Sequence, residues 1–311
     1  MKEVIKVKNL SKSYGNLKAL DNLSFDVKEG EIFGLLGPNG SGKTTTINCL
    51  LALLNYDSGD ISIFGQEMTP TKYEIKEKIG VVFQEVAVFE ELTVRENIDY
   101  FCSLYIKDKK TRFDYVNDAI ALVELTGFTN FKPKQLSGGL LRRLNIACGI
   151  AHKPKLIFLD EPTVAVDPQS RNHILEGIKR LNTEGATIIY TSHYMEEVEF
   201  LCDNILIVDK GKVIAEGTKQ ELKKLVGISL KASFEIEKLS SKMLEKVKGF
   251  KNIVEVEYKD NDLFVSFEKT NNLGDFINFL HDNKIKYSKV YSELPTLNDV
   301  FLELTGKELR D

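Results

Sequence analysis

The chain has 311 residues, of which 42% are hydrophobic and 28% charged, the proportions of an ordinary globular protein with room for one large and one small domain. Its net charge of −4 gives no electrostatic reason to expect a nucleic-acid partner. No stretch reaches the roughly 18–20 apolar residues of a membrane helix, and the first residues lack the apolar core of a signal peptide. If the protein acts at a membrane, we expect it to do so through a partner.

The four cysteines are Cys49, Cys102, Cys148 and Cys202. They are far apart and form no CxxC pair, so we expect free buried thiols in a reducing compartment and no metal site or disulfide framework.

The N-terminal part of the chain is predicted to be antiparallel β structure. Residues 4–10 and 23–27 alternate between apolar and polar side chains, and a turn at 13–16 separates them. The apolar run at 32–36 then predicts a buried strand, and residues 45–54 predict a buried helix. The segment between this strand and helix carries the clearest motif in the chain.

That segment, Gly37-Pro38-Asn39-Gly40-Ser41-Gly42-Lys43-Thr44-Thr45, has the pattern of a phosphate-binding P-loop. Glycines let successive backbone N–H groups surround phosphate oxygens, and the N-terminus of the following helix adds positive potential. Lys43 is placed to reach the β- and γ-phosphates, and the hydroxyl of Thr44 is placed to bind Mg²⁺. The alternative is a glycine turn that happens to carry a lysine.

A helical insertion is predicted after the strands at 61–65 and 79–84, from about residue 85 to 150. Thr93 and Glu96 suit a capping box at the start of one helix, and residues 114–125 predict another. The basic run at 107–112 is interpreted as a solvated loop, in preference to a lipid or partner contact.

The insertion ends in Leu136-Ser137-Gly138-Gly139, which opens a helix with an apolar stripe. Ser137 is the predicted N-cap, and the two glycines leave backbone N–H groups uncovered. This is a second candidate anion-binding helix end. Taken alone, the segment is better explained as a well-capped helix.

Residues 156–160 form an apolar run that delivers Asp160 and Glu161 at its end, where open parallel sheets bind their ligands. Asp160 suits Mg²⁺ binding, and Glu161, one peptide further, faces elsewhere and suits a general base. The alternative is a strand that ends in a polar loop. His193 follows a second buried strand at 187–192 and could contact a γ-phosphate or orient a base. An isolated histidine after a strand is more often only a turn residue.

The C-terminal residues 226–311 follow a different pattern from residues 1–225, so we place a domain boundary between them. Strands at 232–237, 253–258, 263–267 and 285–291 alternate with helices at 242–247 and 273–281, and a last helix is expected at 296–304. The order β-α-β-β-α-β predicts a small ferredoxin-like α+β domain with an accessory or regulatory role.

Taken together, the motifs up to about residue 220 resemble the ATP-binding subunit of an ABC transporter. They occur in that family's order: the A-loop aromatic Tyr14, the P-loop, the Q-loop Gln84, the signature Ser137–Gly139, Asp160 with Glu161, the D-loop Asp167 and the switch His193. The resemblance implies an α/β P-loop fold of ABC type, with a mixed sheet, an antiparallel β subdomain and the helical insertion.

By this resemblance, Tyr14 stacks on adenine, residues 39–45 wrap the phosphates, and Gln84 contacts Mg²⁺ or the attacking water and signals to the membrane partner. His193 binds the γ-phosphate and supports Glu161, while Ser137, Gly138 and Gly139 act on ATP held by a second subunit. The cofactors are ATP and Mg²⁺. The implied assembly is a head-to-tail dimer, expected to be a homodimer, that pairs with a separate integral membrane permease. The chain itself is then expected at the cytoplasmic face of the membrane.

Two positions depart from the commonest family pattern: Leu140 follows the signature where Gln is frequent, and Ala165 stands where Gly is frequent. An apolar residue at 140 and the tail from Leu294 to Gly306 are similar to the ATPases of bacterial ABC-2-type drug and ion exporters. The predicted function is therefore an exporter ATPase with drug, ion or lipid-like cargo. The alternatives are an ABC-type ATPase without a permease, acting in translation or DNA maintenance, and a small-molecule kinase.

Overall fold

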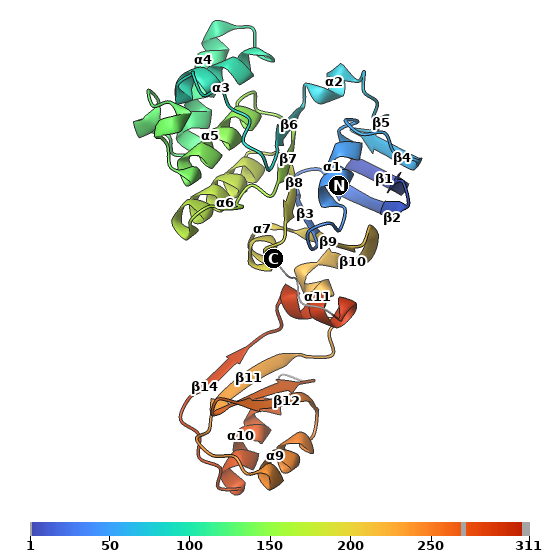
Figure 1. Ribbon diagram of the computed structural model, residues 1–311, viewed down its shortest axis with the longest axis vertical. Helices are drawn as coiled ribbons and strands as arrows, with labels where there is room; N and C mark the ends of the chain where they lie inside the picture. Colours follow the sequence, from blue (N-terminus) through green and yellow to red (C-terminus); the bar gives the residue numbers. More distant parts are fainter. Residues whose placement is uncertain (1, 269–271, 307–311) are drawn as a thin grey trace. The chain divides into compact units, whose positions relative to one another are not determined.

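The computed structural model describes residues 2–268 and 272–306, which form two compact units that meet in sequence between Thr218 and Lys219. The short helix α8 (Lys219–Lys223) therefore belongs to the C-terminal unit, whereas the boundary expected from the sequence follows residue 225. Figure 1 shows the elements of both units.

An antiparallel sheet opens the N-terminal unit, as predicted. Its strand order is β2-β1-β4-β5. The strands are β1 (Glu3–Tyr14), β2 (Leu17–Lys28), β4 (Ser58–Ile63) and β5 (Gln66–Glu67). Alternate side chains such as Ile5 and Val7 are fully buried, so the period-two pattern in the sequence marks the core face of this sheet.

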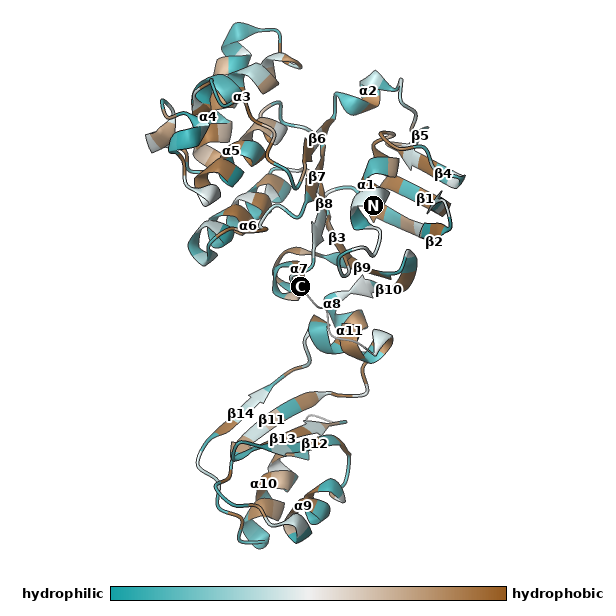
Figure 2. Cartoon of the chain, viewed as in Figure 1, coloured by the Kyte–Doolittle hydropathy of each residue, from teal (hydrophilic) through white to brown (hydrophobic). Residues whose placement is uncertain are grey.

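The central sheet has six strands in the order β10-β9-β3-β8-β7-β6. They are β3 (Ile32–Leu36), β6 (Ile79–Val82), β7 (Leu156–Asp160), β8 (Thr187–Ser192), β9 (Asn204–Asp209) and β10 (Lys212–Thr218). Only β10 pairs in antiparallel fashion, so the sheet is mixed, as expected. Every residue of β3, β7 and β8 is buried, because both faces of the sheet are covered. Figure 2 shows hydrophobic residues, in brown, along β6 and β7.

Helices cover the central sheet. The helix α1 (Lys43–Leu50) contacts both β2 and β7, and so lies between the antiparallel and central sheets. The helices α6 (Pro168–Thr183) and α7 (Met195–Leu201) contact each other, and α7 packs on β3 and β8. The short helix α2 (Tyr73–Lys76) precedes β6.

The predicted insertion consists of α3 (Val94–Ser103), α4 (Lys109–Leu122) and α5 (Gly138–Ile150), which contact one another, and two short 3₁₀ turns, Thr126–Phe128 and Pro133–Gln135. The capping box of Thr93 and Glu96 is confirmed. The interpretation of residues 107–112 as a loop was wrong: α4 begins at Lys109 because Asp108 caps it by accepting a hydrogen bond from the Thr111 backbone N–H at 2.8 Å.

The C-terminal unit contains a four-stranded antiparallel sheet in the order β12-β13-β11-β14. Its elements are β11 (Leu230–Glu235), α9 (Ser241–Lys248), β12 (Ile253–Lys259), β13 (Asp262–Phe267), α10 (Asn272–Asp282), β14 (Val290–Glu293) and α11 (Leu297–Thr305). This order and connectivity are ferredoxin-like, as expected. The last strand is displaced from the predicted 285–291 because Ile285 and Tyr287 pack into the core from a loop.

All four cysteines are buried thiols, as predicted. Among the described residues, no helix has the length and apolar character needed to cross a membrane.

Candidate nucleotide-binding site

The P-loop connects β3 to α1 and is shaped by glycine. Gly42 caps α1 with a φ of 108°, and a Cβ there would lie 2.8 Å from the carbonyl oxygen of Ala19. Gly40 also has a positive φ, of 78°. Both positions need a residue without a side chain. The hydroxyl of Ser41 in the same loop is buried and has no hydrogen-bond partner in the described part of the chain, which leaves it available to a ligand.

Lys43, the first residue of α1, points back into its own loop and is only 5% exposed. Its Nζ donates to the carbonyl oxygens of Gly37, at 2.8 Å, and Pro38, at 3.2 Å. It also lies 3.2 Å from Oε1 of Glu161. The ammonium group is therefore held inside the loop and directed at the end of β7.

The two carboxylates at the end of β7 contact different residues, as predicted. Oδ2 of Asp160 accepts a hydrogen bond from the Thr44 hydroxyl at 2.9 Å, and Oδ1 accepts one from the Thr191 hydroxyl at 2.6 Å. Glu161 instead contacts Lys43 and, through Oε2, Nδ1 of His193 at 3.2 Å. The structure thus brings the P-loop, the β7 carboxylates and the candidate switch histidine into one cluster.

Glu161 turns away from Asp160 because its backbone is left-handed, with a φ of 47°. This conformation is strained for a residue with a Cβ. The Glu161 backbone N–H donates to the Thr191 hydroxyl at 2.9 Å, so Thr191 holds both acidic residues. Thr191 was not predicted as a site residue, because its only signal in the sequence is a hydroxyl in a buried strand directly before Ser192 and His193.

The signature segment lies at the start of α5, and Ser137 caps this helix through the backbone N–H of Leu140 at 3.3 Å, as expected. Gly139 packs tightly against α6: a Cβ there would lie 2.3 Å from the Ser170 hydroxyl and 3.1 Å from Oδ2 of Asp167. Asp167 itself caps α6 by accepting from the Ser170 backbone N–H at 2.9 Å, which lowers the pKa of its carboxyl group. The signature therefore contacts the D-loop, and among the described residues no hydrogen bond or ion pair joins it to its own P-loop.

Ala165, in the loop before Asp167, has a left-handed φ of 58°. A glycine would adopt this conformation without strain, whereas the methyl group of alanine makes it unfavourable and limits the backbone angles that the loop can adopt.

Gln84 and Tyr14 lie apart from this cluster. Gln84 follows β6 with an exposed side chain, and its carbonyl oxygen accepts from Nη1 of Arg142, in α5, at 2.7 Å. Tyr14 ends β1, is 49% exposed, and has the Lys12 ammonium 5.5 Å from its ring centre. No hydrogen bond or ion pair joins either residue to the P-loop within the residues described. Arg142 was missed because one arginine within a helix gives no sign that it fixes a loop.

Comparison with known proteins identifies this arrangement. The ABC transporter family profile matches residues 20–164. The linearmycin resistance ATP-binding protein LnrL of Bacillus subtilis is 38% identical over 99% of this chain and 100% of its own length. The chain belongs to the ATP-binding subunits of ABC transporters. The daunorubicin resistance ATP-binding protein DrrA3 of Streptomyces coeruleorubidus is 33% identical over 98% of this chain and 97% of its own.

Solved ABC cassettes match the N-terminal unit. A dimeric ATP-binding cassette in a post-hydrolysis state, bound to ADP and Pi, is 31% identical over 69% of this chain and 98% of its own, with a TM-score of 0.63. This ABC subunit is an ATPase that powers transport, and it belongs with the ABC-2-type exporter ATPases. Members of the family dimerise and pair with permeases. The kinase and the permease-free ATPase are set aside because full-length relatives are transporter or resistance ATP-binding proteins.

The donor set of this ABC subunit fits Mg²⁺. Thr44 and Asp160 present a hydroxyl and a carboxylate oxygen 2.9 Å apart, and hard oxygen donors of this kind suit Mg²⁺ together with nucleotide phosphates. The described residues contain no group of three His, Cys, Asp or Glu side chains that could hold a metal ion without such phosphates.

Proposed function

We propose that two copies of this chain bind two ATP molecules between them, each ATP held by the P-loop of one copy and the signature segment of the other. Asn39 to Thr45 would surround the phosphates, Tyr14 would stack on adenine, and Ser137, Gly138 and Gly139 of the second copy would close the site. The observation that carries the proposal is the contact of Lys43 with Glu161 at the end of β7, which joins a phosphate-binding lysine to a candidate base.

In this proposal Glu161 is the general base and His193 orients it. A γ-phosphate that enters the loop competes for the Lys43 ammonium, because phosphate is a stronger partner for it than a carboxylate shared with His193. Glu161 is then free to polarise a water molecule. The hydrolytic state would therefore be formed only when nucleotide is bound.

Mg²⁺ would be held by Thr44 and Asp160, with Gln84 as a further candidate ligand, and would neutralise charge on the phosphates when bound. Asp167 would communicate between the two copies, because it lies between the signature glycine and α6 of its own chain.

The proposed partner is an integral membrane permease, so the chain would act as a peripheral subunit at the cytoplasmic face of the membrane. An exposed apolar surface around the Q-loop supports this proposal. It includes Phe89, 45% exposed, which packs edge-on against Tyr100 with ring centres 4.8 Å apart, and Leu104, 53% exposed. Exposed aromatic groups of this kind are typical of protein interfaces. Because two full-length relatives confer linearmycin and daunorubicin resistance, we further propose that the exported compound is a drug-like molecule.

The shared site can be tested by mixing two inactive variants. Lys43→Ala removes the phosphate lysine, and Ser137→Asp keeps a good N-cap while placing a carboxylate where the partner's phosphate would lie. A mixed dimer contains one site with both defects and one intact site. We expect each variant alone to be nearly inactive, and the mixture to recover a substantial part of the wild-type ATPase rate.

If the signature acted within its own chain, every chain in the mixture would carry one defect and no activity would return. That result would overturn the proposed dimer. Wild type mixed with Lys43→Ala is the matched control for subunit exchange.

A further inference from the structure

Glu197, in α7, is a buried carboxylate with an unusual number of hydroxyl donors. It is 2% exposed, and its Oε2 accepts from the hydroxyls of Tyr190 at 2.7 Å, Thr163 at 2.8 Å and Ser192 at 2.8 Å. Its other oxygen, Oε1, lies 3.4 Å from Nε of Arg171. One side chain thus gathers four polar groups at a single point in the core.

Two of these donors flank the Glu161–His193 contact. Thr163 lies two residues after Glu161, in the loop that leaves β7, and Ser192 directly precedes His193 at the end of β8. The third donor, Tyr190, lies within β8, two residues before Ser192, and its hydroxyl also lies 3.5 Å from the Thr163 hydroxyl. Glu197 therefore ties the loop after β7 to the loop after β8.

A second set of contacts leads from Glu197 to the histidine ring. The Arg171 guanidinium lies 4.8 Å from the ring centre of Tyr194, and that ring lies 4.1 Å from the ring of His193. The Tyr194 backbone N–H also donates to the Ser192 hydroxyl at 2.9 Å. Ser192, which Glu197 contacts, thus directly precedes His193 in the backbone, and Arg171, which Glu197 also contacts, lies against Tyr194, the residue beside the His193 ring.

The strained backbone of Glu161 explains why the two loops need these contacts. A left-handed φ at a residue with a Cβ costs about 1 kcal/mol, and it persists only where neighbouring groups fix it. Thr191 holds the Glu161 N–H, and Thr163, bound to Glu197, fixes the chain two residues later. A contribution to folding stability does not by itself explain the cluster, because buried polar clusters can often be replaced by apolar groups without loss of stability.

We propose that Glu197 is a positioning residue for ATP hydrolysis: it fixes the distance between Glu161 and His193 by joining the loops that carry them. This inference rests on the proposed function, in which Glu161 is the base. It assigns Glu197 no contact with nucleotide, so ATP binding through Lys43 is independent of it.

The test removes the donors one at a time from the full-length chain. Thr163→Val and Ser192→Ala each remove the hydrogen bond between one loop and Glu197. We expect kcat to fall about tenfold or more, since small misplacements of catalytic groups have effects of this size. ATP affinity should stay within about twofold. Thr163→Ser restores the hydroxyl and should restore kcat.

Tyr190→Phe is the matched control, because it removes a hydrogen bond to the same oxygen from a residue that carries no catalytic loop. We expect it to lower Tm about as much as the loop variants but to leave kcat within about twofold. If kcat falls in parallel with Tm in all three variants, Glu197 is a stabilising group and the proposal is overturned.

Glu161→Gln, measured alongside, separates the two proposals. If it abolishes turnover while Thr163→Val and Ser192→Ala stay near wild type, the Glu197 proposal fails and the base assignment stands. If Glu161→Gln itself retains turnover, the base assignment fails, and the Glu197 proposal fails with it.

Discussion

Lys43 and Glu161 form a buried ion pair, with Nζ and Oε1 3.2 Å apart and the two side chains 5% and 7% exposed. Each is the group that the other must release for the proposed reaction, since Lys43 has to bind phosphate and Glu161 has to polarise water. In that proposal the pair would keep Glu161 occupied until nucleotide arrives. The same contact also makes the two residues interdependent for stability, because a buried charge that loses its partner is costly.

Replacing Glu161 by glutamine should separate binding from hydrolysis. We expect the Glu161→Gln variant to bind ATP and to accumulate as a dimer with MgATP, while its turnover falls at least about 100-fold because the general base is lost. Size-exclusion chromatography and a phosphate-release assay measure the two effects. The exposed Glu176→Gln, on α6, is the matched control. Turnover near that of wild type would exclude Glu161 as the base.

Asp160→Asn should weaken binding only when Mg²⁺ is present. An asparagine can still accept from Thr191 and donate to Thr44, so the fold should persist, but a neutral amide is a poor ligand for Mg²⁺. We expect affinity for MgATP to fall about tenfold or more, and affinity for ATP in EDTA to stay within about twofold. Equal losses in both conditions would show that Asp160 does not act through the metal.

Gly139→Ala should separate the signature helix from α6. The added Cβ would lie 2.3 Å from the Ser170 hydroxyl and 2.7 Å from the Ser170 Cβ, so one helix must move. We expect a loss of about 1–3 kcal/mol in unfolding free energy, together with reduced ATPase activity.

Gly138→Ala is the stability control for this substitution, since a Cβ there meets nothing within 4 Å and alanine favours helix. Removing the obstruction with Gly139→Ala/Ser170→Gly should recover part of the loss. If Gly139→Ala and Gly138→Ala have the same Tm, the close packing of α5 on α6 is not what Gly139 serves.

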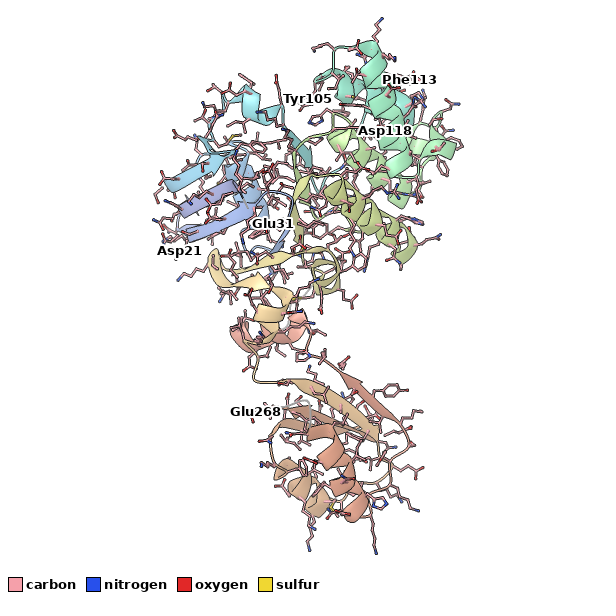
Figure 3. The ribbon with its side chains drawn as sticks, turned by 180° about the vertical axis from the view of Figure 1, so that it is seen from behind. Asp21, Glu31, Tyr105, Phe113, Asp118 and Glu268 are labelled. Carbon is pink, nitrogen blue, oxygen red and sulfur yellow. The ribbon has the colours of Figure 1, made fainter. Side chains whose placement is uncertain are left out.

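His152 should make the fold sensitive to mild acid. Burial lowers its pKa from 6.5, its Nε2 lies 3.1 Å from the Ile79 carbonyl oxygen, and its ring stacks on Tyr105 at 3.9 Å; Tyr105 is labelled in Figure 3. The unfolded chain then binds a proton near pH 6.5 that the folded chain resists. Stability from this group is complete above that pH and declines as the pH falls below it.

Urea unfolding at pH 7.5 and pH 5.5 measures this effect against His152→Phe, which keeps a ring for Tyr105 but cannot be protonated. We expect the wild type to lose more unfolding free energy than the variant between the two pH values. The exposed His281→Gln should behave as the wild type does. A variant as acid-sensitive as the wild type would show that His152 is not the responsible group.

The family and most of the fold could be predicted from patterns in the sequence. The P-loop, the signature and the acidic pair at 160–161 are local patterns, and strand–loop–helix spacing was enough to predict where each lies. The resemblance to the ABC family also implied that His193 supports Glu161, and the structure brings the two side chains into contact. Period-two alternation and continuous apolar runs separated the antiparallel sheet from the central one.

The contacts between individual side-chain atoms depend on the tertiary structure and could not be predicted from the sequence. Glu161 reaches Lys43 because its own backbone turns left-handed and Thr191, from another strand, holds it there. The Glu197 cluster joins three segments that no local pattern connects. Local patterns record the preferences of a few neighbouring residues, whereas these contacts depend on the packing of strands and helices that are distant in the chain. The same reason explains why two loops that look independent in the sequence share one buried carboxylate.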